Sequence, residues 1–154
     1  MRVAREPITE ENARGTRHSD PGVATCVSAL WRVTMPYLEI ATNLTKEKIT
    51  PEILTNLSKL LSAILGKAEQ YCVVRVIPDQ LMTFGGSSDP CATALLISLG
   101  KLGVEENKGH AAKIYEFVEN SLGIPGDRMY IQFFDKPSSE IGYKGTTFHQ
   151  LLGR

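Results

Sequence analysis

The chain has 154 residues, in which 17 lysines and arginines balance 17 aspartates and glutamates. This length favours one domain with a sizeable core, and the zero net charge argues against a nucleic-acid-binding surface and against basic attachment to membranes. No apolar run approaches the roughly 20 residues of a membrane-spanning helix. Three cysteines, Cys26, Cys72 and Cys91, do not make a disulfide framework and favour reduced thiols in a cytosolic protein.

Residues 1–34 differ in composition from the rest of the chain. They contain five arginines and no lysine, whereas the remainder has nine lysines and three arginines. The stretch ENARGTRHSDPG is typical of polar, unstructured chain. Neither a secretory signal nor a transit peptide fits, because a small-residue cleavage site is missing and acidic residues are present. We expect an unstructured leader over 1–34, a folded domain over 36–148 and a short tail over 149–154.

The first predicted unit is a strand, a helix and a second strand. Residues 37–42, YLEIAT, alternate in part, which is typical of a strand. Thr50 and Pro51 are suited to the N-cap and first turn of a helix, whose apolar residues recur every three or four positions until Gly66. The β-branched run YCVVRVI, residues 71–77, predicts the second strand.

The second half repeats this order. ATALLISL, residues 92–99, predicts a strand, Asn107 predicts the N-cap of a helix that ends at Gly123, and RMYIQFF, residues 128–134, predicts the fourth strand. The leucines that precede the two helix-ending glycines lie at positions 65 and 122, which are 57 residues apart. The same offset carries the first strand onto the third, so we predict an internal duplication of a βαβ unit.

Two such units predict an α/β (α+β) fold, with a four-stranded sheet and both helices on one face. The other face has no cover within the chain. Strands 71–77 and 92–99 are nevertheless apolar at nearly consecutive positions, as strands buried on both faces are. We therefore expect further copies of the same chain to cover that face.

Several motifs along residues 35–148 carry a family likeness. In order, they are MPYLEIATN, LGK, VIPDQLMTFGGSSDPCA, SLGKLG, DRMYIQFFD and TTF. Together they resemble the macrophage migration inhibitory factor family of the tautomerase superfamily, more than its relative D-dopachrome tautomerase. The resemblance implies the duplicated βαβ fold, a tautomerase-like homotrimer, and active sites between neighbouring subunits.

The resemblance assigns the role of catalytic base to Pro36. In this family the initiator methionine is removed, and the proline that follows becomes the N-terminus. The chemistry requires that free terminus, because a proline within a chain has an amide nitrogen without useful basicity. A free α-amine has a pKa near ~8, and both burial and a nearby cation such as Lys67 would lower that pKa toward working pH.

The leader conflicts with this chemistry and leaves three explanations. Met35 is the true start, or the leader is removed by proteolysis, or the chain is not a tautomerase. The abrupt change in composition favours a start codon assigned upstream of the true one. From the residues alone, Met35-Pro36 is an ordinary pair before a strand, because a dipeptide has almost no specificity.

The resemblance also implies the substrate-binding residues. Lys67 would bind a substrate carboxylate, although the residue alone is typical of a surface lysine near a helix C-terminus. Leu99 would contact substrate through its backbone. Tyr130 and Gln132 share a face of the fourth strand and would reach into the neighbouring subunit's pocket. Gln132 stands where the family has asparagine, which changes the geometry of that hydrogen bond.

Apolar pocket positions near the C-terminus are matched by Ile141, Tyr143 and Phe148. Tyr143 replaces a tryptophan of the family. Ordinary packing at a subunit interface would explain these three residues equally well.

The implied reaction is keto–enol tautomerisation of phenylpyruvate- or dopachrome-type substrates, with a small aromatic α-keto acid as partner. It requires no cofactor and no metal, and we expect His18, His110 and His149 to be solvated surface residues. The stretch FGGSS, residues 84–88, lacks the sequence pattern of a phosphate-binding loop. Cys91 lacks the second cysteine of the C-x-x-C pair, because Ala94 stands there, so thiol-redox activity is not carried over.

A second function from another class is a cytokine-like ligand of a cell-surface receptor. The same chain would have both functions, or, as the alternative, it would be a receptor ligand whose tautomerase site is vestigial or inactive. A third interpretation is a trimeric scaffold. The sparse cysteines favour a cytoplasmic location, and the resemblance implies secretion by a non-classical route.

Overall fold

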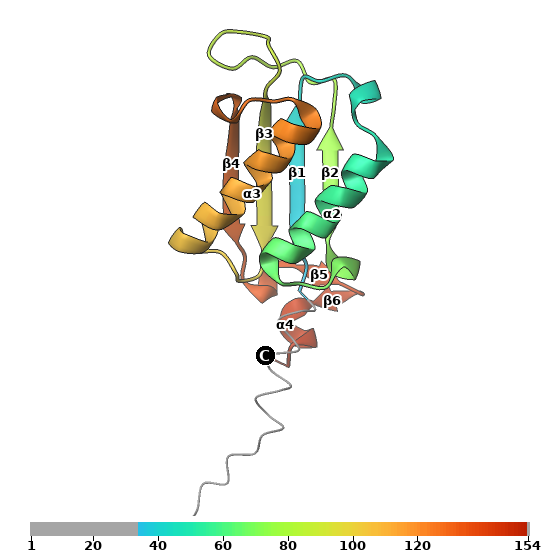
Figure 1. Ribbon diagram of the computed structural model, residues 1–154. Coiled ribbons are helices and arrows are strands. Elements are labelled where there is room, and N and C mark those ends of the chain that lie inside the picture. Colours follow the sequence, from blue (N-terminus) through green and yellow to red (C-terminus); the bar gives the residue numbers. More distant parts are fainter. Residues whose placement is uncertain (1–33, 154) are drawn as a thin grey trace, which may run out of the picture.

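A four-stranded sheet carries two long helices on one face (Figure 1). The structure is a computed structural model that describes residues 34–153, so Cys26, His18 and the expected leader up to residue 33 lie outside the described residues. The sheet order is β2-β1-β3-β4. The strands are β1 (Tyr37–Thr42), β2 (Val73–Ile77), β3 (Ala92–Ser98) and β4 (Met129–Asp135), and the helices are α2 (Pro51–Leu65) and α3 (Val104–Leu122).

The sheet consists of two βαβ units that lie side by side. Strands β1 and β2 are parallel and are joined through α2, and β3 and β4 are parallel and are joined through α3. The two units meet where β1 and β3 pair antiparallel. The predicted fold, a duplicated βαβ unit with both helices on one face, is confirmed (Figure 1).

The first helix begins and ends where its sequence predicts. The Thr50 hydroxyl accepts a hydrogen bond from the Ile53 N–H at 3.4 Å, and Gly66 has a left-handed conformation with φ 62°. For α3 the predicted start at Asn107 is wrong by one turn, since Gly103 is the N-cap. The Asn107 side chain still serves that end, because its oxygen accepts the Gly103 N–H at 3.3 Å.

Two predicted strands begin later than expected because short 3₁₀ turns precede them. Glu69–Tyr71 forms such a turn, so β2 begins at Val73 rather than at residue 71. Gly126–Arg128 forms another and moves the start of β4 to Met129. The remaining elements are η3 (Lys46–Lys48), η6 (Ser138–Glu140), β5 (Gly142–Tyr143), β6 (Thr146–Thr147) and α4 (Phe148–Leu151), which occupies part of the expected tail.

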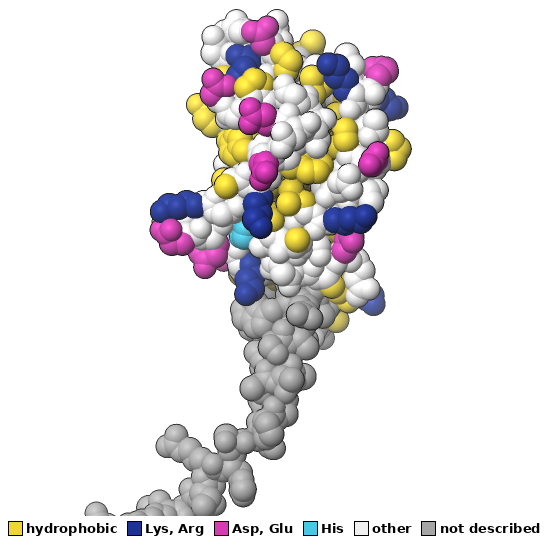
Figure 2. All heavy atoms as spheres, in the orientation of Figure 1, with side chains coloured by type: hydrophobic (Ala, Val, Ile, Leu, Met, Phe, Trp, Pro, Cys, Tyr) yellow, Lys and Arg dark blue, Asp and Glu magenta, His cyan; other side chains and the backbone are white. Residues whose placement is uncertain are grey.

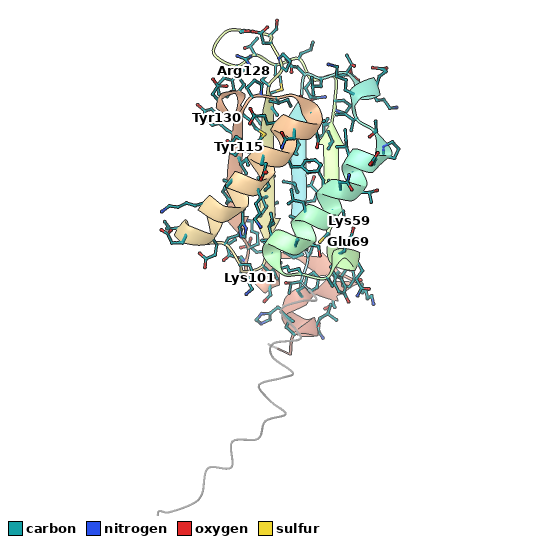
Figure 3. All side chains as sticks on the ribbon, viewed as in Figure 1. Lys59, Glu69, Lys101, Tyr115, Arg128 and Tyr130 are labelled. Carbon is teal, nitrogen blue, oxygen red and sulfur yellow. The ribbon has the colours of Figure 1, made fainter. Side chains whose placement is uncertain are left out.

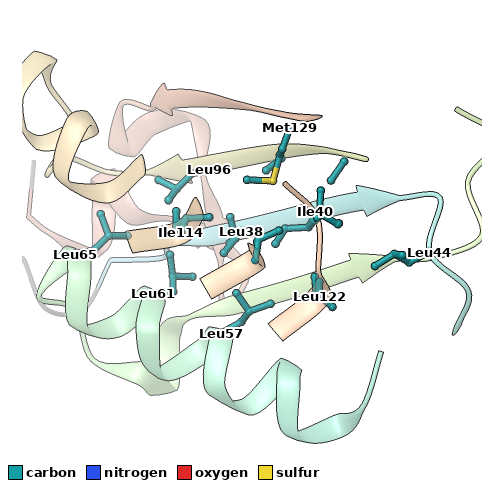
Figure 4. Packing of buried hydrophobic residues seen from close by; sticks show 14 residues of the cluster. Leu38, Ile40, Leu44, Leu57, Leu61, Leu65, Leu96, Ile114, Leu122 and Met129 are labelled. Atoms are coloured by element: carbon teal, nitrogen blue, oxygen red, sulfur yellow. The ribbon is translucent and has the colours of Figure 1, made fainter. Parts of the chain in front are cut away.

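The core lies between the sheet and the two helices (Figure 4). Leu38 and Ile40 point from the central strand toward Leu57 and Leu61 of α2 and Ile114 of α3, and all five side chains are fully buried. In the view of Figure 2, acidic and basic side chains are interspersed around an apolar band. Within residues 34–153, no helix is both long enough and apolar enough to cross a membrane.

We expect Leu61→Ala to lower the free energy of unfolding by about 3 kcal/mol, because it removes a fully buried side chain and leaves a cavity. Lys59→Ala, an exposed change on the same helix, should alter it by less than about 0.5 kcal/mol. Urea titrations at one fixed chain concentration check both values, since association would add to the apparent stability. Equal losses in the two variants would contradict this account of the core.

The other face of the sheet has no buried side chain among its alternating positions. Val73 on β2 is 46% exposed, and Tyr130 and Phe134 on β4 are 67% and 40% exposed. On this face, Glu39 of the central strand β1 and Arg75 of the edge strand β2 form an ion pair at 3.5 Å. A single chain therefore leaves a wide, largely apolar surface on the side opposite the helices.

Candidate active site

Pro36 lies at the end of the sheet where β1 begins and β3 ends. Its neighbour Tyr37 pairs with Ile97 of β3, and its own carbonyl accepts the Val73 N–H of β2 at 2.9 Å. The residue is buried. Backbone pairing thus fixes Pro36 between the first residue of one neighbouring strand and the last residues of the other.

Lys67 comes to the same end of the sheet from the C-terminus of α2. Its side chain is only 3% exposed, and its ammonium donates to the Ser98 hydroxyl at 2.8 Å and to the Leu99 carbonyl at 2.7 Å. The prediction of a surface lysine, drawn from the residue alone, is wrong. An ammonium has three N–H donors, so two orient the group and one remains for a ligand.

The pKa of Lys67 is lowered to about 8, chiefly because burial disfavours the charged form, and the nearby Asp135 carboxylate opposes that shift. The ordinary value is 10.5. Below pH 8 the side chain is therefore a buried cation that can attract an anion. Above pH 8 it becomes neutral and loses that attraction.

We expect two opposite effects of pH from this one group. Affinity for an aromatic carboxylate should fall as pH rises through about 8. Between pH 8 and 10.5 the unfolded chain binds more protons at this lysine than the folded chain, so the free energy of unfolding should rise with pH there. Calorimetric titrations and urea unfolding at pH 7 and 9.5, each compared with Lys67→Gln, isolate both effects. Equal pH dependence in the two proteins would contradict them.

The turn after β3 is held by a side chain from β4 and by one of its own. The Ser98 hydroxyl donates to the Gly100 carbonyl at 2.8 Å, and the Asp135 carboxylate accepts the Gly100 N–H at 2.7 Å. Leu99 therefore lies in a fixed turn directly after β3, one residue beyond the strand's last residue. Neither Ser98 nor Asp135 stood out in the sequence.

An aromatic group closes the same end of the molecule. Phe148 is buried and stacks on Tyr143, with ring centres 5.3 Å apart. The rings of Tyr143 and Tyr71 pack edge to face, with their centres 6.2 Å apart. Tyr71 lies just before β2, whose first residue is hydrogen-bonded to Pro36. The Ile141 carbonyl accepts the Phe148 N–H at 2.9 Å. The three predicted pocket residues are thus brought together, and Tyr71 joins them.

Tyr130 and Gln132 do not reach Pro36 within one chain. Tyr130 pairs with Thr93 near the start of β3, whereas Leu99 follows its end, six residues or roughly 20 Å away at ~3.3 Å per residue. Figure 3 shows Tyr130 and Lys101 at opposite ends of the sheet. Gln132 pairs with Leu95, midway along the strand, and is exposed.

Arg128 organises the surroundings of Tyr130. Its guanidinium donates to four carbonyl groups of one loop, those of Phe84, Ser87, Asp89 and Pro90, at 3.0 to 3.3 Å. It also lies over the Phe84 ring, 5.7 Å from the ring centre. That ring packs against Tyr130 with a centroid distance of 5.0 Å. The loop that carries the FGGSS stretch is therefore a fixed support for Tyr130.

Residues 35–149 match the family model described as macrophage migration inhibitory factor (MIF). The chain belongs to this family. It is 43% identical over 114 residues to the macrophage migration inhibitory factor homolog of Trichuris trichiura, covering 74% of this chain and 100% of that protein. It is 36% identical to the macrophage migration inhibitory factor of Xenopus laevis, covering 74% of this chain and 99% of that one.

Solved structures of the family have the same fold. The macrophage migration inhibitory factor of Trichinella spiralis matches with a TM-score of 0.71 at 35% identity, over 73% of this chain and 99% of that one. The homologue from Prochlorococcus marinus matches with a TM-score of 0.68 at 30% identity, over 73% and 98%. Membership of the MIF family supports an isomerase kind of activity and a tautomerase or cytokine type of function in general.

For this MIF-family chain, the expectation that His110 is a solvated surface residue is also wrong. His110 is 8% exposed rather than solvated, and its ring nitrogen Nε2 donates to the Lys101 carbonyl at 2.8 Å. A signal was present in the sequence, because His110, Ile114 and Val118 recur every four residues on one helix face. His149 is exposed as expected. No cluster of three or more metal-ligating side chains occurs among residues 34–153.

Proposed function

We propose that the chain, once it begins at Pro36, interconverts the keto and enol forms of small aromatic α-keto acids of the phenylpyruvate or dopachrome type. The observation that carries this proposal is the buried ammonium of Lys67, held by Ser98 and Leu99 at the end of the sheet where Pro36 begins. The start of the family match at Met35 supports Pro36 as the N-terminus of the active form.

Each group has a defined part in this reaction. The remaining N–H of Lys67 binds the substrate carboxylate and places the neighbouring carbonyl and its α-carbon near Pro36. The free secondary amine of Pro36 removes a proton from that carbon, which lies next to the keto group. The C–H electrons form the C=C bond while the carbonyl π electrons move to oxygen, and the protonated amine then gives the proton to that oxygen and becomes free again. Burial and the lysine charge both lower the pKa of the amine toward working pH. Ile141, Tyr143 and Phe148 offer an apolar wall for the aromatic ring.

The complete site is proposed to form between two chains of a homotrimer. Tyr130 and Gln132 lie on the uncovered face of the sheet, far from the Pro36 of their own chain, so they would serve a neighbour. We expect light scattering of the protein that begins at Pro36 to give the mass of three chains. A monomer at micromolar concentration would contradict this arrangement.

The test of the enzyme is a keto–enol absorbance assay on the chain that begins at Pro36, with its N-terminus established by intact mass. Pro36→Gly is the matched variant, because glycine supplies a primary amine at the same position without the pyrrolidine ring. We expect rapid conversion of phenylpyruvate by the first protein and a loss of about 10² or more with the variant. Equal rates in both proteins would overturn the role of Pro36.

A cytokine-like ligand for a cell-surface receptor is the second candidate. It is favoured by the names of the curated relatives, such as that of Xenopus laevis, and by Gln132 in place of the family's asparagine. Under this proposal the protein is cytoplasmic and also leaves the cell by a non-classical route. Receptor engagement by a chain that leaves phenylpyruvate unchanged would favour the ligand role over the enzyme.

A further inference from the structure

His110 is a buried side chain that the reaction described above does not use. It lies on the sheet-facing side of α3 in the same stripe as Ile114 and Val118, yet it is polar. Its Nε2 donates to the Lys101 carbonyl at 2.8 Å. A leucine could fill such a position but could not donate a hydrogen bond. What the imidazole adds is therefore its hydrogen bond to the Lys101 carbonyl.

The held segment has an unusual backbone. Gly100 and Lys101 are both left-handed, with φ 70° and 67°. Glycine adopts this conformation freely, whereas a lysine side chain disfavours it. Asp135 fixes the Gly100 N–H and Ser98 fixes the Gly100 carbonyl, and His110 fixes the carbonyl of Lys101. Side chains of β3, β4 and α3 therefore converge on one turn.

This turn carries the groups that orient Lys67. The Leu99 carbonyl and the Ser98 hydroxyl, which accept two of the three N–H donors of Lys67, lie immediately before Gly100. A change in the Gly100–Lys101 conformation would move the Leu99 carbonyl and redirect the third donor. Only two peptide units separate the Lys101 carbonyl, which His110 holds, from the Leu99 carbonyl, which accepts from Lys67.

We propose that His110 is a positioning residue for carboxylate binding: it keeps the Gly100–Lys101 turn in the shape that aims Lys67 at the carboxylate. This inference rests on the proposed function for the identity of the ligand. It does not require that Pro36 be catalytic. If His110 has this positioning role, a change at His110 should alter the affinity for a ligand's carboxylate ion (the acid at neutral pH) and leave the affinity for its uncharged ester unchanged.

The test uses 3-phenylpropanoate, which has the carbon skeleton of phenylpyruvate but no keto group, and its methyl ester. Calorimetry on the chain that begins at Pro36 compares the unsubstituted protein with His110→Leu and His110→Gln. Leucine removes the donor, whereas glutamine can place an N–H near the position of Nε2. We expect His110→Leu to weaken acid binding about tenfold and His110→Gln less than threefold, in line with the loss of one hydrogen bond. Ester binding should not change.

A second substitution separates positioning from simple packing. In the His110→Leu background, Lys101→Gly should restore part of the acid affinity, because glycine removes the steric cost of the left-handed conformation that the histidine bond otherwise offsets. Should the leucine variant not fold, His110→Asn replaces it, since its shorter amide cannot reach the Lys101 carbonyl. Lack of rescue by Lys101→Gly, or equal losses for acid and ester, would overturn the proposal.

The outcomes also distinguish this inference from the proposed enzyme. Unchanged acid binding in the variants overturns the role of His110 while phenylpyruvate turnover can persist. Conversely, tight acid binding that depends on His110 in a protein without tautomerase activity supports this inference and removes the proposed catalysis. If the unsubstituted protein does not bind 3-phenylpropanoate, the carboxylate site and the role of His110 are both overturned.

Discussion

A protein that retains residues 1–35 is expected to show no tautomerisation of phenylpyruvate above background, whereas the chain beginning at Pro36 should be active. In the longer protein the nitrogen of Pro36 belongs to the Met35–Pro36 peptide bond, and its lone pair is delocalised into the carbonyl. Loss of a positioned general base typically costs a factor of about 10² to 10⁴ in rate. The measurement is the initial rate of each form on the same substrate.

The comparison needs two controls. Intact mass before and after the assay establishes that the leader stays attached, and matching circular dichroism and urea midpoints establish that both forms fold. If the longer protein is folded, keeps all of its residues and turns over phenylpyruvate as fast as the shorter one, Pro36 is not the base and the proposed mechanism fails.

The second large effect is expected from Lys67→Gln. Glutamine keeps a donor for Ser98 and Leu99 but removes the charge that faces the carboxylate. A hydrogen bond to a charged group is worth about 1.5 to 3 kcal/mol, so the KM for phenylpyruvate should rise roughly 10- to 150-fold. The carboxylate would be bound in both the ground and transition states, so kcat should change much less when each protein is assayed at its own optimal pH. At one fixed pH, loss of the lysine charge would also raise the pKa of the Pro36 amine and lower kcat.

Two comparisons make this result specific. The methyl ester of the substrate lacks the negative charge, so its kcat/KM, measured for each protein at its own optimal pH, should be nearly the same for both proteins. Lys59→Gln removes a charge from the exposed face of α2 (Figure 3) and should change neither constant by more than about twofold, as exposed pairs and charges contribute little. An equal loss for acid and ester would mean that Lys67 acts through folding instead of through its charge.

The fold could be predicted from the sequence because the residues that begin and end its helices act through local interactions. Thr50 and Gly66 mark the ends of α2 through interactions within a few residues, and the 57-residue offset reveals the duplication. The start of α3 was missed because Asn107 has the residue type of an N-cap, while the backbone turns into the helix at Gly103. The Asn107 amide oxygen instead accepts the N–H of the N-cap residue Gly103 from within the helix, and sequence alone does not distinguish the two arrangements.

The site was less predictable because its properties depend on packing between distant segments. Nothing next to Lys67 in sequence shows that it is buried, since Ser98 and Leu99 lie more than thirty positions away. Its role came from the resemblance to the MIF family. His110 could have been recognised from its four-residue spacing with Ile114, but its bond to Lys101 depends on an unusual turn that residue types do not reveal.

The loop that Arg128 holds is fixed by hydrogen bonds within a single chain. Ordering of mobile segments on association consumes binding free energy and slows docking. In this chain that entropy is lost on folding, so in the proposed trimer the support of Tyr130 would not have to become ordered when subunits associate. Each subunit of the proposed trimer would thus bring a preorganised Tyr130 to a neighbour's site, and dissociation of the trimer would leave that arrangement intact.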